Sequence, residues 1–130
     1  LTSSLLPMDQ TLYEHLGGRE TIAAVVDGLY TRLLDDDLIG PVFGGVDMAR
    51  LRGHMTTFLS ASLGSDNVYA GRDLFSAHAG LGITDEMFNR TLVHLVGVLV
   101  ASEVAPETVD LVIDCLTPLR LQVVHESSVA

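Results

Sequence analysis

The side chains with the clearest chemical potential in this sequence are two histidines, each set among apolar residues at helical spacing. His54 lies between Leu51 and Phe58 on one apolar stripe, and His78 follows Phe75 on a short segment bounded by glycines. Burying an imidazole without a partner costs about 1–3 kcal/mol. Each ring therefore needs an internal hydrogen bond or a metal ion, and neutral imidazole is a common metal ligand. On this pattern alone, both alternatives stay open.

Other familiar catalytic motifs are absent from the sequence. It has no glycine-rich phosphate loop, no His-Glu-x-x-His zinc motif and no Gly-x-Ser-x-Gly nucleophile elbow. Cys115 is the single cysteine and has no basic neighbour in sequence, so we expect a small packed residue and not a reactive thiolate. We expect structural roles for His15, His94 and His125.

Helical periodicity runs along nearly the whole chain and predicts an all-α domain with four longer helices and several short ones. The longer helices are expected over 22–34, after the cap Asp47, after the cap Thr84 and from Pro106 to Val123. Asp73 is a candidate cap for a short helix that carries His78. The acidic run at 35–37 is interpreted as a solvated helix end or turn.

Composition and charge limit the partners that this chain can have. Its 130 residues, of which 48% are hydrophobic, fit one packed domain. The net charge is −10, and all seven basic residues are scattered arginines, which argues against nucleic acid or an anionic lipid surface as a partner. The sequence has no apolar run of about 20 residues and no secretory signal pattern. We therefore expect no membrane span and a cytoplasmic location.

Several stretches resemble, in order and spacing, the group I (N-type) truncated haemoglobins of the globin superfamily, over about Thr11 to Val124. The matching stretches are 13–18, 29–30, 32–34, 42–43, 46–50, 58–59, 63–64, 69–72 and 77–83. One such stretch would be weak, whereas the whole ordered set is specific. We expect an N-terminal arm over 1–8, a truncated globin domain over 9–125 and a C-terminal tail over 126–130.

The resemblance implies a two-over-two helical sandwich around a haem, with His78 as the proximal iron ligand. Haem iron needs one strong axial donor and one open position to bind a diatomic gas. Tyr30 matches the distal tyrosine, whose hydroxyl stabilises the partial negative charge of bound dioxygen by about 1.5–3 kcal/mol. Phe43 matches the phenylalanine that wedges the haem, and Phe58 matches an aromatic residue packed against it.

The distal helix departs from the pattern of many family members. Many relatives carry a leucine or glutamine at the position of Leu51 and a glutamine one turn later, at the position of Met55. Neither Leu51 nor Met55 can donate a hydrogen bond. Tyr30 is therefore expected to be the sole protein donor to the ligand, unless His54 turns inward. His54 matches a position that ligates the iron in some cyanobacterial members, so six-coordination by His54, or more weakly by Met55, is one alternative. The other is a ring turned toward a haem propionate or solvent.

Three arginines bear on how the haem is held. Arg72 and Arg52 are candidate partners for the haem propionates, because guanidinium pairs well with carboxylate, and each is alternatively a solvated surface charge. The cyanobacterial members also attach haem covalently through a histidine in the last helix. Arg120 occupies that region here, so we expect a non-covalent haem b.

Two functions follow from the resemblance. In the first, the dioxygen complex converts nitric oxide to nitrate, Tyr30 is the catalytic residue, and an unidentified reductase restores ferrous iron. In the second, the protein stores, delivers or senses dioxygen, or another diatomic ligand such as carbon monoxide, without turnover. A helical interaction domain without a cofactor is a third class, which the ordered motifs disfavour.

Overall fold

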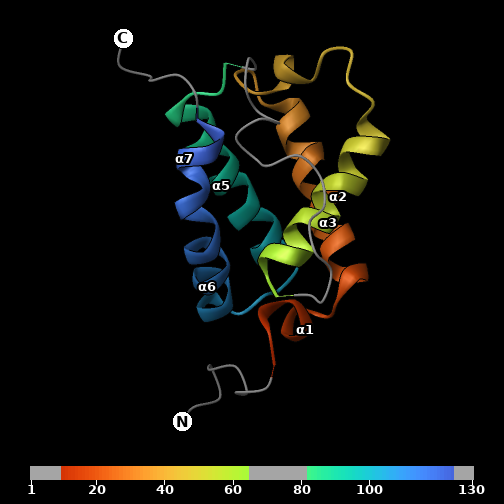
Figure 1. The fold of residues 1–130 in the computed structure, drawn as a ribbon, viewed down its shortest axis with the longest axis vertical. Helices are drawn as coiled ribbons and strands as arrows, with labels where there is room; N and C mark the ends of the chain where they lie inside the picture. Colours follow the sequence, from red (N-terminus) through yellow and green to blue (C-terminus); the bar gives the residue numbers. More distant parts are fainter. Residues whose placement is uncertain (1–9, 65–81, 125–130) are drawn as a thin grey trace.

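The computed structural model describes residues 10–64 and 82–124, and these segments are helical (Figure 1). The elements in chain order are α1 (Leu12–Leu16), α2 (Arg19–Asp35), η1 (Gly40–Phe43), α3 (Met48–Ser62), α5 (Asp85–Ala101), α6 (Pro106–Leu116), η2 (Thr117–Leu119) and α7 (Arg120–Val123). The all-α prediction with four longer helices is confirmed. No helix in these two segments is long and apolar enough to cross a membrane.

The predicted helix starts and breaks lie where the sequence signals them. Asp47 and Thr84 cap α3 and α5, because their side chains accept hydrogen bonds from backbone amides in the first turn. Gly17 ends α1 in the left-handed conformation, with φ at 115°. A Cβ there would lie 2.5 Å from Thr21 Oγ1, so only glycine allows the turn into α2.

The last predicted helix is interrupted, which the apolar periodicity did not indicate. It was expected to run unbroken from Pro106 to Val123, but α6 ends at Leu116 and three residues of 3-10 helix follow before α7. Pro118 lies in this interruption. Because proline has no amide proton, it cannot donate the i→i−4 hydrogen bond that would continue the α-helix.

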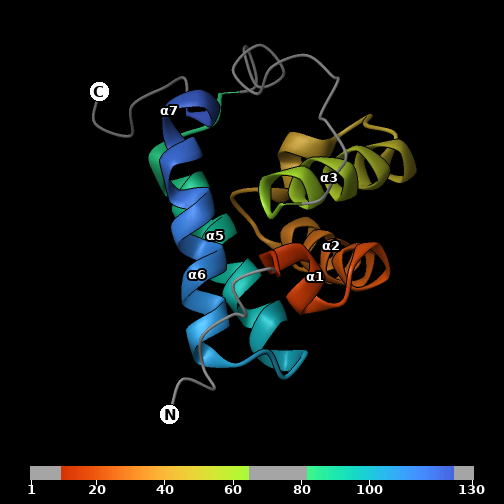
Figure 2. The same cartoon turned by 60° about the horizontal axis from the view of Figure 1, so that its bottom comes forward.

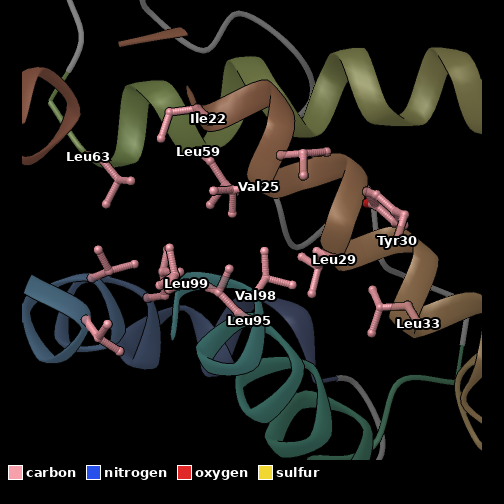
Figure 3. Close-up of a cluster of buried hydrophobic side chains, with 14 of the residues drawn as sticks. Ile22, Val25, Leu29, Tyr30, Leu33, Leu59, Leu63, Leu95, Val98 and Leu99 are labelled. Atoms are coloured by element: carbon pink, nitrogen blue, oxygen red, sulfur yellow. The ribbon is translucent and has the colours of Figure 1, made fainter. Parts of the chain in front are cut away.

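Two helix pairs form the two layers of the fold (Figure 2): α2 packs on α3, and α5 packs on α6. The layers meet where α2 crosses α5, and Figure 3 shows apolar side chains of both helices facing one another there. The approach is close, since a Cβ on Gly28 would lie 3.1 Å from Val98 Cγ1. The predicted stripe of α2 is buried from Ile22 to Leu33, whereas Leu34, one residue before the helix ends, is exposed.

The acidic run at 35–37 contains a buried carboxylate, so its interpretation as a solvated turn is wrong for Asp36. The Asp36 side chain is only 6% exposed. Its Oδ1 accepts hydrogen bonds from the amides of Leu38, at 2.8 Å, and Ile39, at 3.1 Å. Asp36 therefore organises the turn that leads from α2 into η1.

The same carboxylate is bound by two side chains of α5. His94 Nε2 donates to Asp36 Oδ2 at 2.8 Å, and Arg90 Nη1 donates to Oδ1 at 3.1 Å. The hydrogen bond from His94 holds the pKa of Asp36 well below its ordinary value. Burial acts in the opposite direction, and the two turn amides and Arg90 add to the lowering. The structural role expected for His94 is this bond.

Asp36→Asn should reduce the stability of the fold, and the loss should depend on pH. A carboxylate with a depressed pKa stabilises the folded state above its unfolded-state pKa, and this stabilisation disappears as pH falls toward its folded-state pKa. We expect the gap in unfolding free energy between wild type and variant to be widest above about pH 5 and to narrow progressively as pH falls below about 4, the ordinary pKa of an aspartate. Urea titrations followed by circular dichroism measure it. The exposed neighbour gives the control Asp37→Asn, and an equal gap for both variants would contradict the assignment.

Candidate functional site

An apolar cavity of about 340 Å³ lies among α2, η1, α3 and the helices from α5 to α7. Among its described lining residues, three carry polar side-chain atoms: Tyr30, His54 and Thr91. The rest of the described wall is aliphatic, aromatic or thioether. Such a wall favours a large apolar ligand, and the few polar groups are those that orient what binds.

The tertiary structure brings the described members of the predicted site together. Residues from three elements, far apart in sequence, line this one cavity: Tyr30, Phe43, Leu51, His54, Met55 and Phe58. Their contacts with haem stay predictions. His78 and Arg72 lie outside the described residues.

Tyr30 is the buried polar group of this cavity. Its side chain is 2% exposed, and within the described segments its hydroxyl has no hydrogen-bond partner. Its ring meets the Phe43 ring edge-on, with the centroids 5.6 Å apart and the planes at 81°. Burial raises the pKa of Tyr30 to about 12, against a smaller opposing effect of Arg52. The phenol is therefore neutral at physiological pH and able to donate to a ligand in the cavity.

His54 does not have the burial that its sequence position suggests. The apolar stripe predicts a buried ring, but His54 is exposed while it also lines the cavity. It therefore lies at the rim, where solvent can satisfy the imidazole. The flanking Leu51 and Met55 are half-buried and contribute no donor. Within the described wall, Tyr30 and His54 are the titratable side chains that face the cavity.

Arg52, one of the two arginines expected at a haem propionate, has a protein partner on α2. Arg52 is not among the described residues that line the cavity, and its Nε lies 3.9 Å from Asp27 Oδ1 on α2. That separation is an ion pair without a hydrogen bond, which contributes little at a partly exposed position. The expectation that Arg52 pairs with a haem propionate stays a prediction.

Arg120 has a role that sequence reasoning missed. Its guanidinium donates to Asp85 Oδ1 at 3.0 Å and to the Asn89 side chain, and its Cζ lies 4.7 Å from the centroid of the Phe88 ring. Phe88 is part of the cavity wall, so Arg120 holds α7 against that wall by a cation–π contact. No local pattern in the sequence indicates this pairing.

Two smaller expectations have mixed outcomes. Cys115, expected to be packed, is exposed on α6. His15 is structural, since its ring lies 3.3 Å from Gln10 Oε1 and 3.5 Å from Thr108 Oγ1. Neither residue lines the cavity.

The cavity residues fit a haem. A porphyrin is a flat apolar ring that needs apolar walls, and the described wall supplies them with aromatic side chains from η1, α3 and α5. The hydroxyl of Tyr30, buried without a protein partner in the described part of the chain, is suited to a polar ligand on the iron. No group of three or more metal-binding side chains occurs in the described segments, so the described residues do not favour a bare metal ion.

Comparison with known proteins agrees with the fold and the cavity. Residues 11–125 match the bacterial-like globin family. The group 1 truncated haemoglobin of Mycolicibacterium paratuberculosis is 34% identical over 113 residues, which cover 87% of this chain and 83% of that protein. The chain belongs to the bacterial-like globins, a family of haem-based ligand-binding proteins, and within it to the group 1 truncated haemoglobins.

Solved structures show the same two-over-two fold. The truncated haemoglobin of Tetrahymena pyriformis in its Fe(III) form has a TM-score of 0.85 at 26% identity, covering 90% of this chain and 100% of that chain. The 2/2 haemoglobin of Synechococcus has a TM-score of 0.81 at 26% identity, covering 87% of this chain and 95% of that chain. The haem of that Synechococcus protein is covalently attached.

Tyr30→Phe should change how stability depends on alkaline pH. The pKa of Tyr30 is about 12 in the folded state against an ordinary 10.0, so the unfolded chain ionises first. Stability is then fully present below pH 10 and falls as pH rises toward 12. We expect the thermal midpoint of wild type to fall more steeply than that of the variant above about pH 10. Parallel curves for the two proteins would contradict the burial of a neutral phenol.

Proposed function

We propose that this chain holds a non-covalent haem b, binds dioxygen, carbon monoxide and nitric oxide, and oxidises nitric oxide to nitrate. The observation that carries the proposal is the apolar cavity with one buried phenol, Tyr30, that has no protein partner in the described segments. A hydrogen-bond donor held in an apolar site is what retains a ligand with partial negative charge.

The roles of the residues follow from their chemistry. When bound, the haem would supply an iron that takes up diatomic gases. His78 would donate the proximal nitrogen, and Arg72 would pair with a propionate. Phe43 and Phe58 would pack against the ring from the cavity wall that they line. Tyr30 would hold the ligand by donating its hydroxyl proton in a hydrogen bond, without losing that proton.

Non-covalent attachment is supported by the partners of Arg120. This residue stands in the region where some relatives carry an attaching histidine, and it is engaged with Asp85, Asn89 and the Phe88 ring. A guanidinium so held is not a nucleophile for a haem vinyl group. Extraction into acidified organic solvent should remove the haem completely.

The catalytic part of the proposal is tested by rapid mixing. Dioxygen and nitric oxide combine to nitrate with uptake of one electron, which leaves ferric iron, and an unidentified reductase returns it to the ferrous state. Stopped-flow mixing of the dioxygen complex with nitric oxide should give ferric protein and one nitrate per complex consumed. Slow oxidation with no stoichiometric nitrate would favour storage or sensing.

The exposure of His54 at the cavity rim favours the alternative function, storage or sensing with internal six-coordination. The His54 ring is exposed and also lines the cavity, so it would be free to ligate a haem iron held there. Internal ligation would compete with dioxygen and lower its apparent affinity by the fraction of protein left open.

His78→Ala should abolish normal haem ligation, because the resemblance assigns the proximal nitrogen to His78. Among the described histidines only His54 lines the cavity, and it lies at the rim. We expect protein without stoichiometric haem, or with haem that lacks the proximal iron–histidine stretch in resonance Raman spectra. His15→Ala is the matched control and should keep a normal Soret band. An unaltered proximal stretch in the His78 variant would overturn the assignment.

Tyr30→Phe should speed the release of dioxygen by about tenfold or more, because it removes a charge-assisted hydrogen bond and little volume. Laser photolysis or stopped-flow replacement of dioxygen by carbon monoxide measures the rate. An unchanged rate would mean that another group, His54 being the remaining titratable side chain in the described wall, holds the ligand.

His54→Ala separates internal ligation from a solvent-facing role. If His54 ligates the iron, the ligand-free ferrous wild type is partly low-spin, and gas binding shows a slow step that saturates with ligand concentration. The variant should then be high-spin and lose that step. Met55→Leu is the control for a thioether ligand and should leave the spectrum unchanged. A purely high-spin wild type with binding linear in ligand concentration would exclude internal ligation.

A further inference from the structure

The short element η1 forms part of the cavity wall but has little to hold it in place by itself. Val42 and Phe43 of η1 line the cavity, yet η1 has one turn of 3-10 helix and no side-chain cap hydrogen bond. A single turn of this kind is weakly stable in isolation. Its position therefore depends on the turn that precedes it.

Asp36 supplies the hydrogen bonds that fix this turn. Besides the two bonds from its side chain to the amides of Leu38 and Ile39, its carbonyl accepts from the Gly40 amide at 2.7 Å. Three successive backbone amides leading into η1 thus end on one residue. Ile39 itself is buried and lines the cavity, so a shift of Asp36 moves wall residues on both sides of Gly40.

The carboxylate is in turn held from α5, mainly by His94. The His94 ring, 24% exposed, binds Oδ2 at 2.8 Å, and Asp36 is the partner it has in the described structure. Arg90, 44% exposed, binds Oδ1 but also binds Glu86 at 3.1 Å. His94 lies between Thr91 and Leu95, which line the cavity. Helix α5 therefore forms part of the cavity wall and also holds the turn at Asp36 that leads into η1.

The chain of contacts ends at Tyr30. The Phe43 ring meets the Tyr30 ring edge-on at 5.6 Å, and the Tyr30 hydroxyl has no hydrogen bond in the described segments that would fix its direction. The orientation of the phenol is then set by packing, of which Phe43 is the aromatic part. A phenol donates a strong hydrogen bond only over a narrow range of oxygen–acceptor distances. A small shift of the Tyr30 ring therefore weakens the bond.

We propose that His94 is a positioning residue for the ligand site: through Asp36 it fixes η1, so that Phe43 holds the Tyr30 hydroxyl in the direction of the bound gas. The inference rests on the proposed function, since it assigns Tyr30 as the donor to that gas. His94 touches neither ligand nor cavity and acts only through the buried carboxylate of Asp36.

The first test compares three variants on α5 with wild type. Each protein is measured as its ferrous dioxygen complex and as its ferrous carbon monoxide complex. His94→Ala should raise the dioxygen release rate about threefold to tenfold, part of the effect of losing the whole hydrogen bond. It should also shift the carbon–oxygen stretch of bound carbon monoxide toward its position in Tyr30→Phe. His94→Gln, whose amide can donate to Asp36 Oδ2, should restore both values. Val93→Ala, at an adjacent position that is 70% exposed, should match wild type.

A double variant separates positioning from a general loss of structure. In a Tyr30→Phe background, His94→Ala should change neither the release rate nor the stretch further, because the residue it positions is gone. Additive effects, or failure of His94→Gln to restore the wild-type values, would overturn the proposal. If His94→Ala does not fold, Asp36→Asn and His94→Gln give the same comparison.

A haem-free measurement keeps the inference distinct from the proposed function. In protein labelled with 3-fluorotyrosine, the ¹⁹F signal that disappears in Tyr30→Phe belongs to Tyr30. That signal should move or broaden in His94→Ala and stay in place in Val93→Ala. An unmoved signal would overturn the inference even if haem and gas bind as proposed. Lack of a Soret band would overturn the proposed function and with it the role toward bound gas, whereas the ¹⁹F signal would still decide whether His94 orients Tyr30.

Discussion

The close crossing of α2 and α5 is the contact on which the rest of the structure depends. The helices approach closely where Gly28 faces Val98. Any side chain at Gly28 would displace a methyl group of Val98. α2 is also the helix that packs on α3, so this crossing joins the two layers. Tyr30 lies on the same helix and lines the cavity, so the placement of α2 fixes where the phenol lies.

A small domain that keeps a cavity has less apolar contact with which to hold its short elements. Hydrogen bonds and ion pairs at the ends of those elements, here called polar ties, hold them in place instead. Asp36 joins the turn before η1 to α5, and Arg120 joins α7 to the start of α5 and to Phe88. Both ties end beside residues that line the cavity. The polar groups thus shape the site from outside, while its inner wall stays apolar.

The chemistry of the cavity follows from a scarcity of donors. The side chains of Leu51 and Met55 on α3 have no hydrogen-bond donor, and His54 lies at the rim of the cavity. The buried Tyr30 is left to provide directionality, and burial that raises its pKa to about 12 keeps it protonated over the whole physiological range. Among the described wall residues Tyr30 is the buried side chain with a free hydroxyl, so the contacts that orient its ring bear on ligand binding as well as on stability.

Local sequence signals determined the helices, their caps and the candidate members of the site. Periodicity predicted the buried stripe of α2, and capping residues predicted the starts of α3 and α5. The ordered motifs predicted Tyr30, Phe43 and Phe58 as members of one site, and these three residues line one cavity. The tertiary structure alone decided that Asp36 is buried and bound to His94, 58 residues away. It also decided that His54 and Cys115 are exposed, and that Arg120 lies over Phe88. Helical periodicity says which residues share a face of one helix, whereas burial and pairing of a polar side chain depend on what another helix places opposite it.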